Sequence, residues 1–443
     1  MRHIQAITIL TLIFHTAAAQ EPWSLEKCIE YALEHNITVR QQSLNVAGSD
    51  NLLKKSKLSF FPDLDISLGH SLNWGRSVDL QNLEIIHNRL SQSTSIAASS
   101  SIYLIDGLSR LYGLISSRQG LEAAEEEAER IKDDITLSVI KSYMQVLLAQ
   151  EELNAAMKHL ESISAQRERT VILVEEGTLA YTSLLETEAQ LAAERVDAVN
   201  AENRLEIDML NLKQLLGLPA GAGLAIAFPE TGAQPTSHAL YDVDEIYSRA
   251  QSLPFIQSAR MAIDKSLTDL KSAKGQYWPK LSLSASYGTF YSSSTYAPDG
   301  SVYPFFSQFR DNINPAVSIG LSIPLFNNGE TKAAVREAEL EHERCILELE
   351  ARQQTLYKDI QTAVTEVRNC RRRIDAALAN LSLATESFNC ARERFDTGTI
   401  DGTDYTTARN SMIEAESEYI RAKYQYLFIV RVLDFHNHGA MTP

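Results

Sequence analysis

Four segments of the chain alternate apolar and polar residues with a period of two, which is typical of β-strands with two different faces. In the first segment, residues 61–74, one face carries Leu64, Ile66 and Leu68, and the other carries mostly aspartate, serine and glycine. The same pattern recurs over residues 94–105, 279–291 and 315–326. The sequence therefore predicts four strands, arranged as two hairpins, each with one apolar face.

Around the strand pairs the hydrophobic period changes to that of α-helices. Apolar residues alternate at spacings of three and four from Ile360 to Phe395, which is the seam of a coiled coil. We expect two helices of close to 70 residues, over 108–176 and 330–396. Four helices of about half that length are expected over 23–58, 180–217, 242–276 and 402–434. Two short helices end to end match one long helix, so the pattern predicts a helical tube that continues the strands.

The order of strands and helices occurs twice in the sequence, as two repeats that lie roughly 220 residues apart. Residues 54–62 of the first copy, in which Lys54 and Lys57 precede Phe-Phe-Pro, match residues 271–279 of the second, in which Lys271 and Lys274 precede Tyr-Trp-Pro. We predict a first structural repeat over 20–217, a linker rich in Gly and Pro over 218–240, a second repeat over 241–435 and a C-terminal tail over 436–443.

The strands have the length and composition of strands that cross a membrane. They span about 10 to 14 residues, and their polar faces are mostly Ser, Gly and Asn. Aromatic residues gather at the strand ends, and we expect them at the membrane interface: Trp74, Tyr277, Trp278, Tyr287 and Tyr291. The alternative is a soluble sandwich whose sheet faces are half covered.

Four strands cannot close a barrel by themselves. An open sheet edge in hydrocarbon leaves backbone groups unpaired, at a cost of several kcal/mol each. The chain is therefore expected to share a barrel with copies of itself. Small barrels begin near eight strands, so two copies are the least and three would give about twelve strands. The residues alone leave this choice open.

The N-terminus has the layout of a secretory signal peptide over residues 1–19. Arg2 and His3 precede an apolar run to Phe14, and small residues follow up to Ala19. No later stretch of about 18 apolar residues predicts a transmembrane helix. The formal net charge of −16 argues against nucleic acid as a partner.

The sequence shows no motif for catalysis, a cofactor or a metal ion. P-loop, dinucleotide, HExxH and nucleophile-elbow patterns are missing, so we expect no enzyme activity and no cofactor. Cys345, Cys370 and Cys390 lie 20 to 25 residues apart on one predicted helix, too far to bond within the chain. His436 and His438 fall in the predicted tail, where we expect no metal site.

The order of these features resembles the TolC-like outer-membrane efflux protein family. The resemblance rests on the signal peptide, the duplicated helix-hairpin-helix plan, the aromatic-Pro entry to each strand, the Ile-Pro-Leu-Phe run over 323–326 before Gly329, and the turn over 395–404. It covers essentially the whole mature chain. It implies a mostly α fold with a membrane β-barrel, in which a homotrimer forms a shared twelve-stranded barrel in the outer membrane and a long helical tunnel in the periplasm.

The same resemblance implies a function and partners. The protein would be the passive exit duct of a tripartite efflux or type I secretion system. It would dock on a periplasmic adaptor (membrane fusion) protein and an inner-membrane pump.

The resemblance also assigns roles to the turns between the long and short helices, which would form the periplasmic tips. The first tip, Gly177-Thr178-Leu179, would contact the adaptor, and the second would form the gate. Ile400 and Thr407 stand where the family has an arginine and a second aspartate, a departure from its usual locking salt bridge. The gate residues are Phe395, Asp396, Gly398, Thr399, Ile400, Asp401 and Asp404.

Two interpretations of Asp404 remain open. A ring of this carboxylate from several chains, with Asp401, would concentrate cations at the tunnel mouth. Alternatively, Asp404 is the N-cap of the following helix.

Two other classes of protein fit part of the pattern. A trimeric surface adhesin also donates strands to a shared barrel, although its strands are expected together at the C-terminus. A secreted coiled-coil scaffold would have the helices and would need no lipid.

Overall fold

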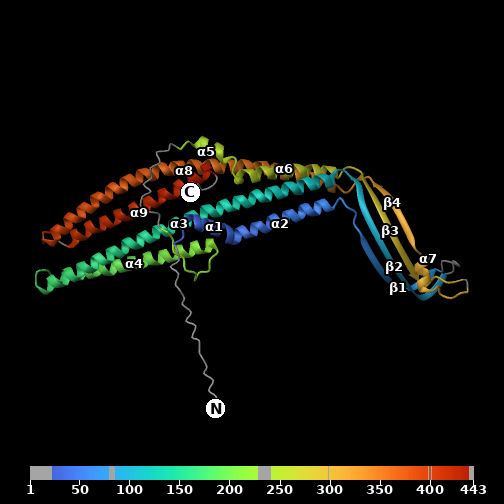
Figure 1. Cartoon of the computed structure of the whole chain (residues 1–443), viewed down its shortest axis with the longest axis horizontal. Coiled ribbons are helices and arrows are strands. Elements are labelled where there is room, and N and C mark those ends of the chain that lie inside the picture. Colours follow the sequence, from blue (N-terminus) through green and yellow to red (C-terminus); the bar gives the residue numbers. More distant parts are fainter. Residues whose placement is uncertain are drawn as a thin grey trace, which may run out of the picture. The chain divides into compact units, whose positions relative to one another are not determined.

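The computed structural model describes residues 22–78, 85–227, 241–297, 299–397, 399–400 and 402–438. The chain forms two compact units. One unit takes the chain up to Ser43, Ala128–Leu253 and the part from Gln354 onward, and its described residues are mainly helical. The other takes Leu44–Glu127 and Pro254–Gln353, and it holds the sheet and the helical segments that run into it (Figure 1). The expected signal peptide, residues 1–19, lies outside the described residues.

The sheet is antiparallel with the strand order β1-β2-β3-β4. Each copy supplies one hairpin, and pairing of β2 with β3 joins the two hairpins into one sheet. β1 and β4 are its edges. The strands are β1 (Asp65–Val78), β2 (Ile85–Asp106), β3 (Lys280–Ser292) and β4 (Asn314–Ser322).

The register of the sheet separates an apolar face from a serine face, as the alternation predicted. Leu283 of β3 lies opposite Ile102 of β2 and Ile319 of β4, so the three side chains share one face. On the other face the hydroxyls of Ser71 and Ser93 lie 2.6 Å apart.

The strand boundaries differ from the predicted ones at several ends. β2 begins at Ile85 rather than at residue 94, because it runs on through a polar stretch that carries no clear alternation. β4 ends at Ser322 rather than at residue 326, since Pro324 has no N–H to continue the ladder. β1 is shifted toward 65–78 because a turn and Pro62 occupy the positions before it.

The long helices have the predicted extent. α3 (Ser109–Glu175) and α8 (Glu330–Asp396) contain 67 residues each. α4 (Tyr181–Leu216) returns beside α3, and α9 (Gly402–His438) returns beside α8 (Figure 1). Because α9 continues to His438, His436 and His438 belong to a helix and not to the predicted tail; residues 439–443 lie outside the described part.

Two of the expected short helices are broken. The first is split into α1 (Leu25–His35) and α2 (Ile37–Leu58) by Asn36, whose amide donates to the carbonyl of Leu215 at 2.8 Å and whose Oδ1 accepts from the Thr38 N–H. The other is split into α5 (Val243–Ala250) and α6 (Pro254–Gly275), because proline is favoured at the first turn of a helix and not inside it. A further short helix, α7 (Phe305–Asp311), between β3 and β4 was not expected.

The main core cluster of the helical unit is formed by α1, α3, α4 and α9. Fully buried side chains include those of Cys28, Ile140, Leu147 and Leu212. Burial raises the pKa of the Cys28 thiol to about 12. The four cysteines are unbonded, and Cys370 is buried on α8.

Part of the predicted linker belongs to this core. Ile226 is buried and forms a parallel bridge with Trp23, and the Tyr143 hydroxyl donates to the carbonyl of Ala227 at 2.6 Å. Leu218, Leu224 and Ile226 of the predicted linker therefore contact the core, whereas residues 228–240 lie outside the described residues.

Candidate functional site

The first helix tip is closed by a left-handed glycine. Gly177 has φ +76°, and the N–H groups of Gly177 and Thr178 donate to the carbonyls of Val174 and Leu173 at 3.0 and 2.9 Å. This is a Schellman motif, which satisfies the last carbonyls of α3 and reverses the chain into α4. Leu179 also donates to Leu173, at 3.1 Å, so the three predicted tip residues form one compact turn.

The second tip repeats the bond that defines this motif. The Thr399 N–H donates to the carbonyl of Arg394, five residues back, at 2.8 Å, and the hydroxyls of Thr397 and Thr399 lie 2.9 Å apart. Ile400 is half-buried. Gly398 and Asp401, both predicted gate residues, lie outside the described residues, as does the side chain of Asp396.

An aromatic stack fastens the second tip. Phe395, near the end of α8, stacks on Tyr405 of α9 with ring centroids 4.9 Å apart, and Phe388 meets the same tyrosine at 5.7 Å. Tyr405 is buried, with 6% of its surface exposed. The sequence predicted Phe395 but missed Tyr405, whose partner lies across the turn.

Asp404 is exposed in the first turn of α9, which begins at Gly402. It is therefore inside the helix and does not occupy the N-cap position. A carboxylate in the first turn is favoured by the positive end of the helix dipole. Its exposure leaves the gate interpretation as the one to be tested.

A buried ion pair joins the two copies below this tip. Arg409 of α9 lies 2.7 Å from Glu194 of α4 and also donates to the carbonyl of His159 on α3 at 3.3 Å. Arg409 is 2% exposed and Glu194 is 9% exposed. Removing either partner would leave an uncompensated charge in the helical core.

Further along α9 the same junction is continued by a histidine contact. The Nε2 atom of His159 lies 3.0 Å from the Glu416 carboxylate. The hydrogen bond from His159 lowers the pKa of Glu416, which is partly buried. The sequence missed these contacts because their partners lie more than 200 residues apart and carry no local motif.

The apolar face of the sheet is exposed in the protomer. Ile66 of β1 and Val317 of β4 are both 76% exposed, and Leu68, Ile319 and Leu321 are also exposed. Isolated soluble domains rarely leave such a continuous apolar surface uncovered. Of the predicted interface aromatics, Trp74, Tyr277, Trp278 and Tyr287 are exposed, while Tyr291 packs on Phe305 with ring centroids 4.8 Å apart.

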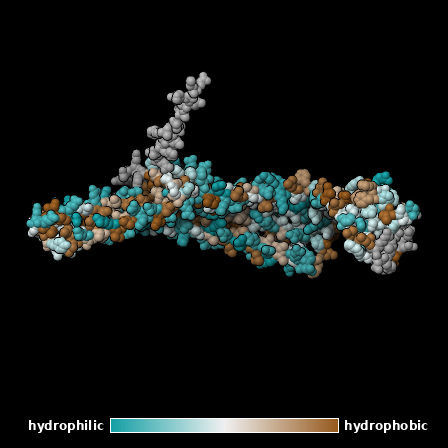
Figure 2. All heavy atoms as spheres, turned by 90° about the horizontal axis from the view of Figure 1, so that it is seen from below, coloured by the Kyte–Doolittle hydropathy of each residue, from teal (hydrophilic) through white to brown (hydrophobic). Residues whose placement is uncertain are grey.

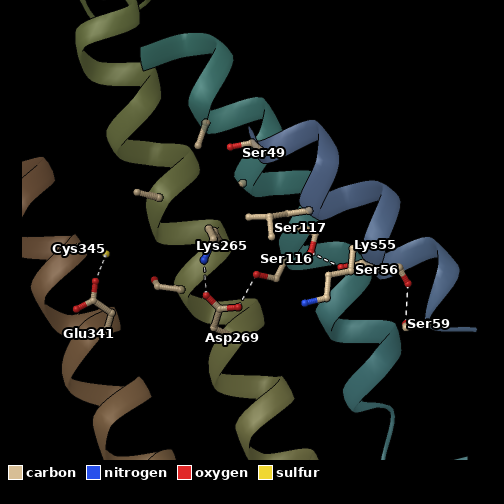
Figure 3. A pocket seen from close by; sticks show the side chains of 15 residues that line it. Ser49, Lys55, Ser56, Ser59, Ser116, Ser117, Lys265, Asp269, Glu341 and Cys345 are labelled. Carbon is tan, nitrogen blue, oxygen red and sulfur yellow. Dashed lines mark hydrogen bonds and ion pairs between the residues drawn. The ribbon is translucent and has the colours of Figure 1, made fainter. Parts of the chain in front are cut away.

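The sheet unit also has a polar hollow of about 610 Å³ between its helices. Figure 3 shows small side chains from α2 and α3 facing Lys265 and Asp269 of α6 and Glu341 of α8. Lys265 lies 2.7 Å from Asp269, which also accepts a hydrogen bond from Ser116. Lys265 and Asp269 in this hollow are thus paired with each other.

Beside the hollow, Ser266 meets His342 at 2.9 Å, a contact that the sequence did not predict. The Ser266 hydroxyl also lies 2.8 Å from the carbonyl of Ile263, to which it can donate. The contact links α6 to α8.

The profile of the outer membrane efflux proteins (OEP) matches the chain in two stretches, over residues 28–218 and 246–434. The chain belongs to this family. The two matched stretches correspond to the two copies, and they include both helix tips and all four strands.

Curated relatives agree with this assignment. The chain is 25% identical to the alkaline protease secretion protein AprF of Pseudomonas aeruginosa over 314 residues, which are 70% of this chain and 63% of AprF. It is 21% identical to the outer membrane protein TolC of Vibrio cholerae over 376 residues, which are 85% of this chain and 81% of that protein. The match thus spans less than two thirds of AprF and most of TolC.

Solved structures share the fold. CusC superimposes with a TM-score of 0.78 at 18% identity, covering 94% of this chain and 92% of that chain. The Campylobacter jejuni CmeC outer membrane channel gives the same score and identity, covering 94% and 85%. The chain therefore has the fold of outer-membrane channels. Its membership of the outer membrane efflux protein family places it in the outer membrane. No helix among the described residues is long and apolar enough to cross a bilayer.

Proposed function

We propose that three copies of this chain form an outer-membrane exit duct for a tripartite efflux or secretion system. The observation that carries the proposal is the sheet, which has two open edges and an exposed apolar face. In a lipid bilayer, contact between the apolar face and the acyl chains is favourable. Each unpaired backbone group on β1 and β4 would nevertheless cost several kcal/mol. Pairing of β4 with β1 of the next copy removes both edges, and three copies supply twelve strands.

The opposite face of the sheet fits the interior of such a barrel. Its side chains are mostly serine, with paired hydroxyls such as those of Ser284 and Ser318 at 2.9 Å. Small hydroxylated side chains leave room for water and cargo, as in other outer-membrane channels. The duct is passive and has no catalytic role, since cargo and energy come from an inner-membrane pump through a periplasmic adaptor.

The two tips have different roles in this proposal. The Gly177-Thr178-Leu179 turn contacts the adaptor. The second tip closes the tunnel, with Phe395 held on Tyr405 and with Asp404, Asp401 and Asp396 giving the mouth a negative charge. Because relatives such as AprF are named for protease secretion, protein cargo is one class to be tested.

Membrane fractionation and the mass of the purified complex test this function. The full chain should sediment with outer membranes, require detergent for extraction, and have about three times the mass of the mature protomer. In planar bilayers it should conduct ions. A protomer that stays in solution without detergent would contradict the proposal.

A further inference from the structure

A second depression in the sheet unit lies where the strands meet the helices. It is a groove of about 740 Å³, lined mainly by apolar side chains of the β2–α3 turn and of α3, by Trp278, and by Lys271 and Lys274 of α6. Trp278 is 66% exposed, and Ile105, Leu108 and Leu111 are also exposed. Figure 2 shows brown, hydrophobic residues on the surface in the region where helices and sheet meet.

The groove continues the apolar face of the sheet. Ile105 lies opposite Leu281, and Leu281 lies opposite Leu321, so all three are on the face that we assign to lipid. A ligand in the groove would therefore lie along the membrane surface of the barrel and not in its interior.

The charges beside the groove are of two kinds. Arg110 is half-buried, 2.6 Å from Asp106 and 3.1 Å from the carbonyl of Ser59, with its guanidinium over the ring of Phe60. Lys271 and Lys274 are exposed on one side of α6, one turn apart. The Nζ atom of Lys274 lies 3.9 Å from the Glu339 carboxylate.

This charge is unusual for the chain as a whole. The net charge is −16, yet the four stretches at the helix side of the strands, 54–63, 103–112, 271–280 and 322–332, hold eight Lys and Arg residues against three Asp and Glu. Both copies place two lysines one turn apart before an aromatic pair and proline. Cations beside aromatic rings are the arrangement expected at a membrane interface with anionic headgroups.

Leu108 is an independent indication of a ligand. Its φ is +64°, a left-handed conformation that costs a leucine roughly 1–2 kcal/mol. In the second copy the last residue before the long helix is Gly329, with φ +82°, which adopts this conformation without strain. The first copy thus keeps an exposed leucine in the groove where the fold favours glycine.

We propose that this groove binds an anionic phospholipid of the leaflet on the helix side of the membrane. An acyl chain lies along Ile105, Leu108 and Leu111, and the phosphate is bound by the amines of Lys271 and Lys274. Free phosphate does not fit a groove with an apolar floor, whereas a lipid matches both parts of it. The inference rests on the proposed placement of the sheet in the outer membrane.

Native mass spectrometry of the full chain, purified in detergent with phosphatidylglycerol or phosphatidylcholine, tests the site. Lys271→Gln/Lys274→Gln should lower the retention of phosphatidylglycerol by roughly tenfold or more, and that of phosphatidylcholine, whose phosphate charge is offset by its own choline cation, by a clearly smaller factor. Lys141→Gln/Lys158→Gln, which removes two exposed lysines of the helical unit, should change neither. Leu108→Gly should lower the retention of both lipids while its melting temperature stays the same or rises, because the backbone strain is removed.

Three results would overturn the site. These are unchanged phosphatidylglycerol retention in the lysine variant, an equal loss in the control, or displacement of the lipid from the wild type by millimolar inorganic phosphate. Retention is counted per protomer, because the groove lies within one chain. Failure of trimer formation would therefore reject the proposed function, and loss of lipid binding with an intact trimer would reject only the site.

Discussion

At the level of single residues, the second tip combines two residues that the sequence identified with others that it did not. Asp404 and Phe395 were expected at this tip from the family resemblance. In the structure Phe395 lies near the end of α8 and Asp404 near the start of α9. Tyr405 and the Arg409–Glu194 pair were missed. Their partners come from the far side of a turn or from the other copy, and no local spacing indicates such contacts.

The charge of Asp404 is expected to set the ion preference of the tunnel mouth. Asp404→Asn keeps the shape of the side chain and removes one carboxylate from each protomer. We expect the preference for cations over anions to fall by roughly two- to fivefold, since a unit charge at about 4 Å in water contributes about 1 kcal/mol. The measurement is the reversal potential in planar bilayers under a salt gradient.

Glu202→Gln is the matched control for this change. Glu202 is an exposed carboxylate in the middle of α4, far along the chain from the turn. If the two variants shift the reversal potential equally, Asp404 has no special place at the mouth.

At the scale of elements, glycine positions in and after helices should respond to alanine in opposite ways. Gly177→Ala forces a Cβ into a left-handed residue, so the last turn of α3 should open more readily, with hydrogen exchange at Thr178 about tenfold faster. Gly48→Ala, inside α2 with open space around the added Cβ, should slow local exchange by up to about fivefold. Hydrogen-exchange mass spectrometry measures both, and equal effects of the two substitutions would contradict the capping role.

Sequence patterns determine some helix boundaries and miss others. The expected helix over about 330–396 coincides with α8, where the apolar spacing runs to Phe395 and glycines flank both ends. The breaks at Asn36 and before Pro254 were missed since the hydrophobic pattern continues across both. Asn36 ends α1 by hydrogen-bonding to Leu215, a contact between distant parts of the chain.

At the scale of the whole molecule, the buried Arg409–Glu194 pair is expected to hold the two copies together. Glu194→Ala leaves Arg409 without a partner in the core and should lower the free energy of unfolding by about 3–5 kcal/mol. Replacing both residues by Leu and Met should recover most of this loss. Urea unfolding followed by circular dichroism measures the difference.

Glu202→Ala, at an exposed site, is the control for the change in the free energy of unfolding. Glu202→Ala should change the free energy of unfolding by no more than about 0.5 kcal/mol. A loss for Glu194→Ala within that range would show that water reaches Arg409 and that the ion pair does not join the copies.

The open edges of the sheet also have a consequence for biogenesis. Before assembly, a newly exported protomer presents two unsatisfied strands and an oily surface to the aqueous periplasm, which is the situation in which chains pair indiscriminately. Faster synthesis raises the concentration of unassembled protomers and so favours aggregation over assembly of the shared barrel. Yield should therefore depend on the rate at which protomers are delivered, and slow expression with ample chaperone should give more finished ducts than strong induction.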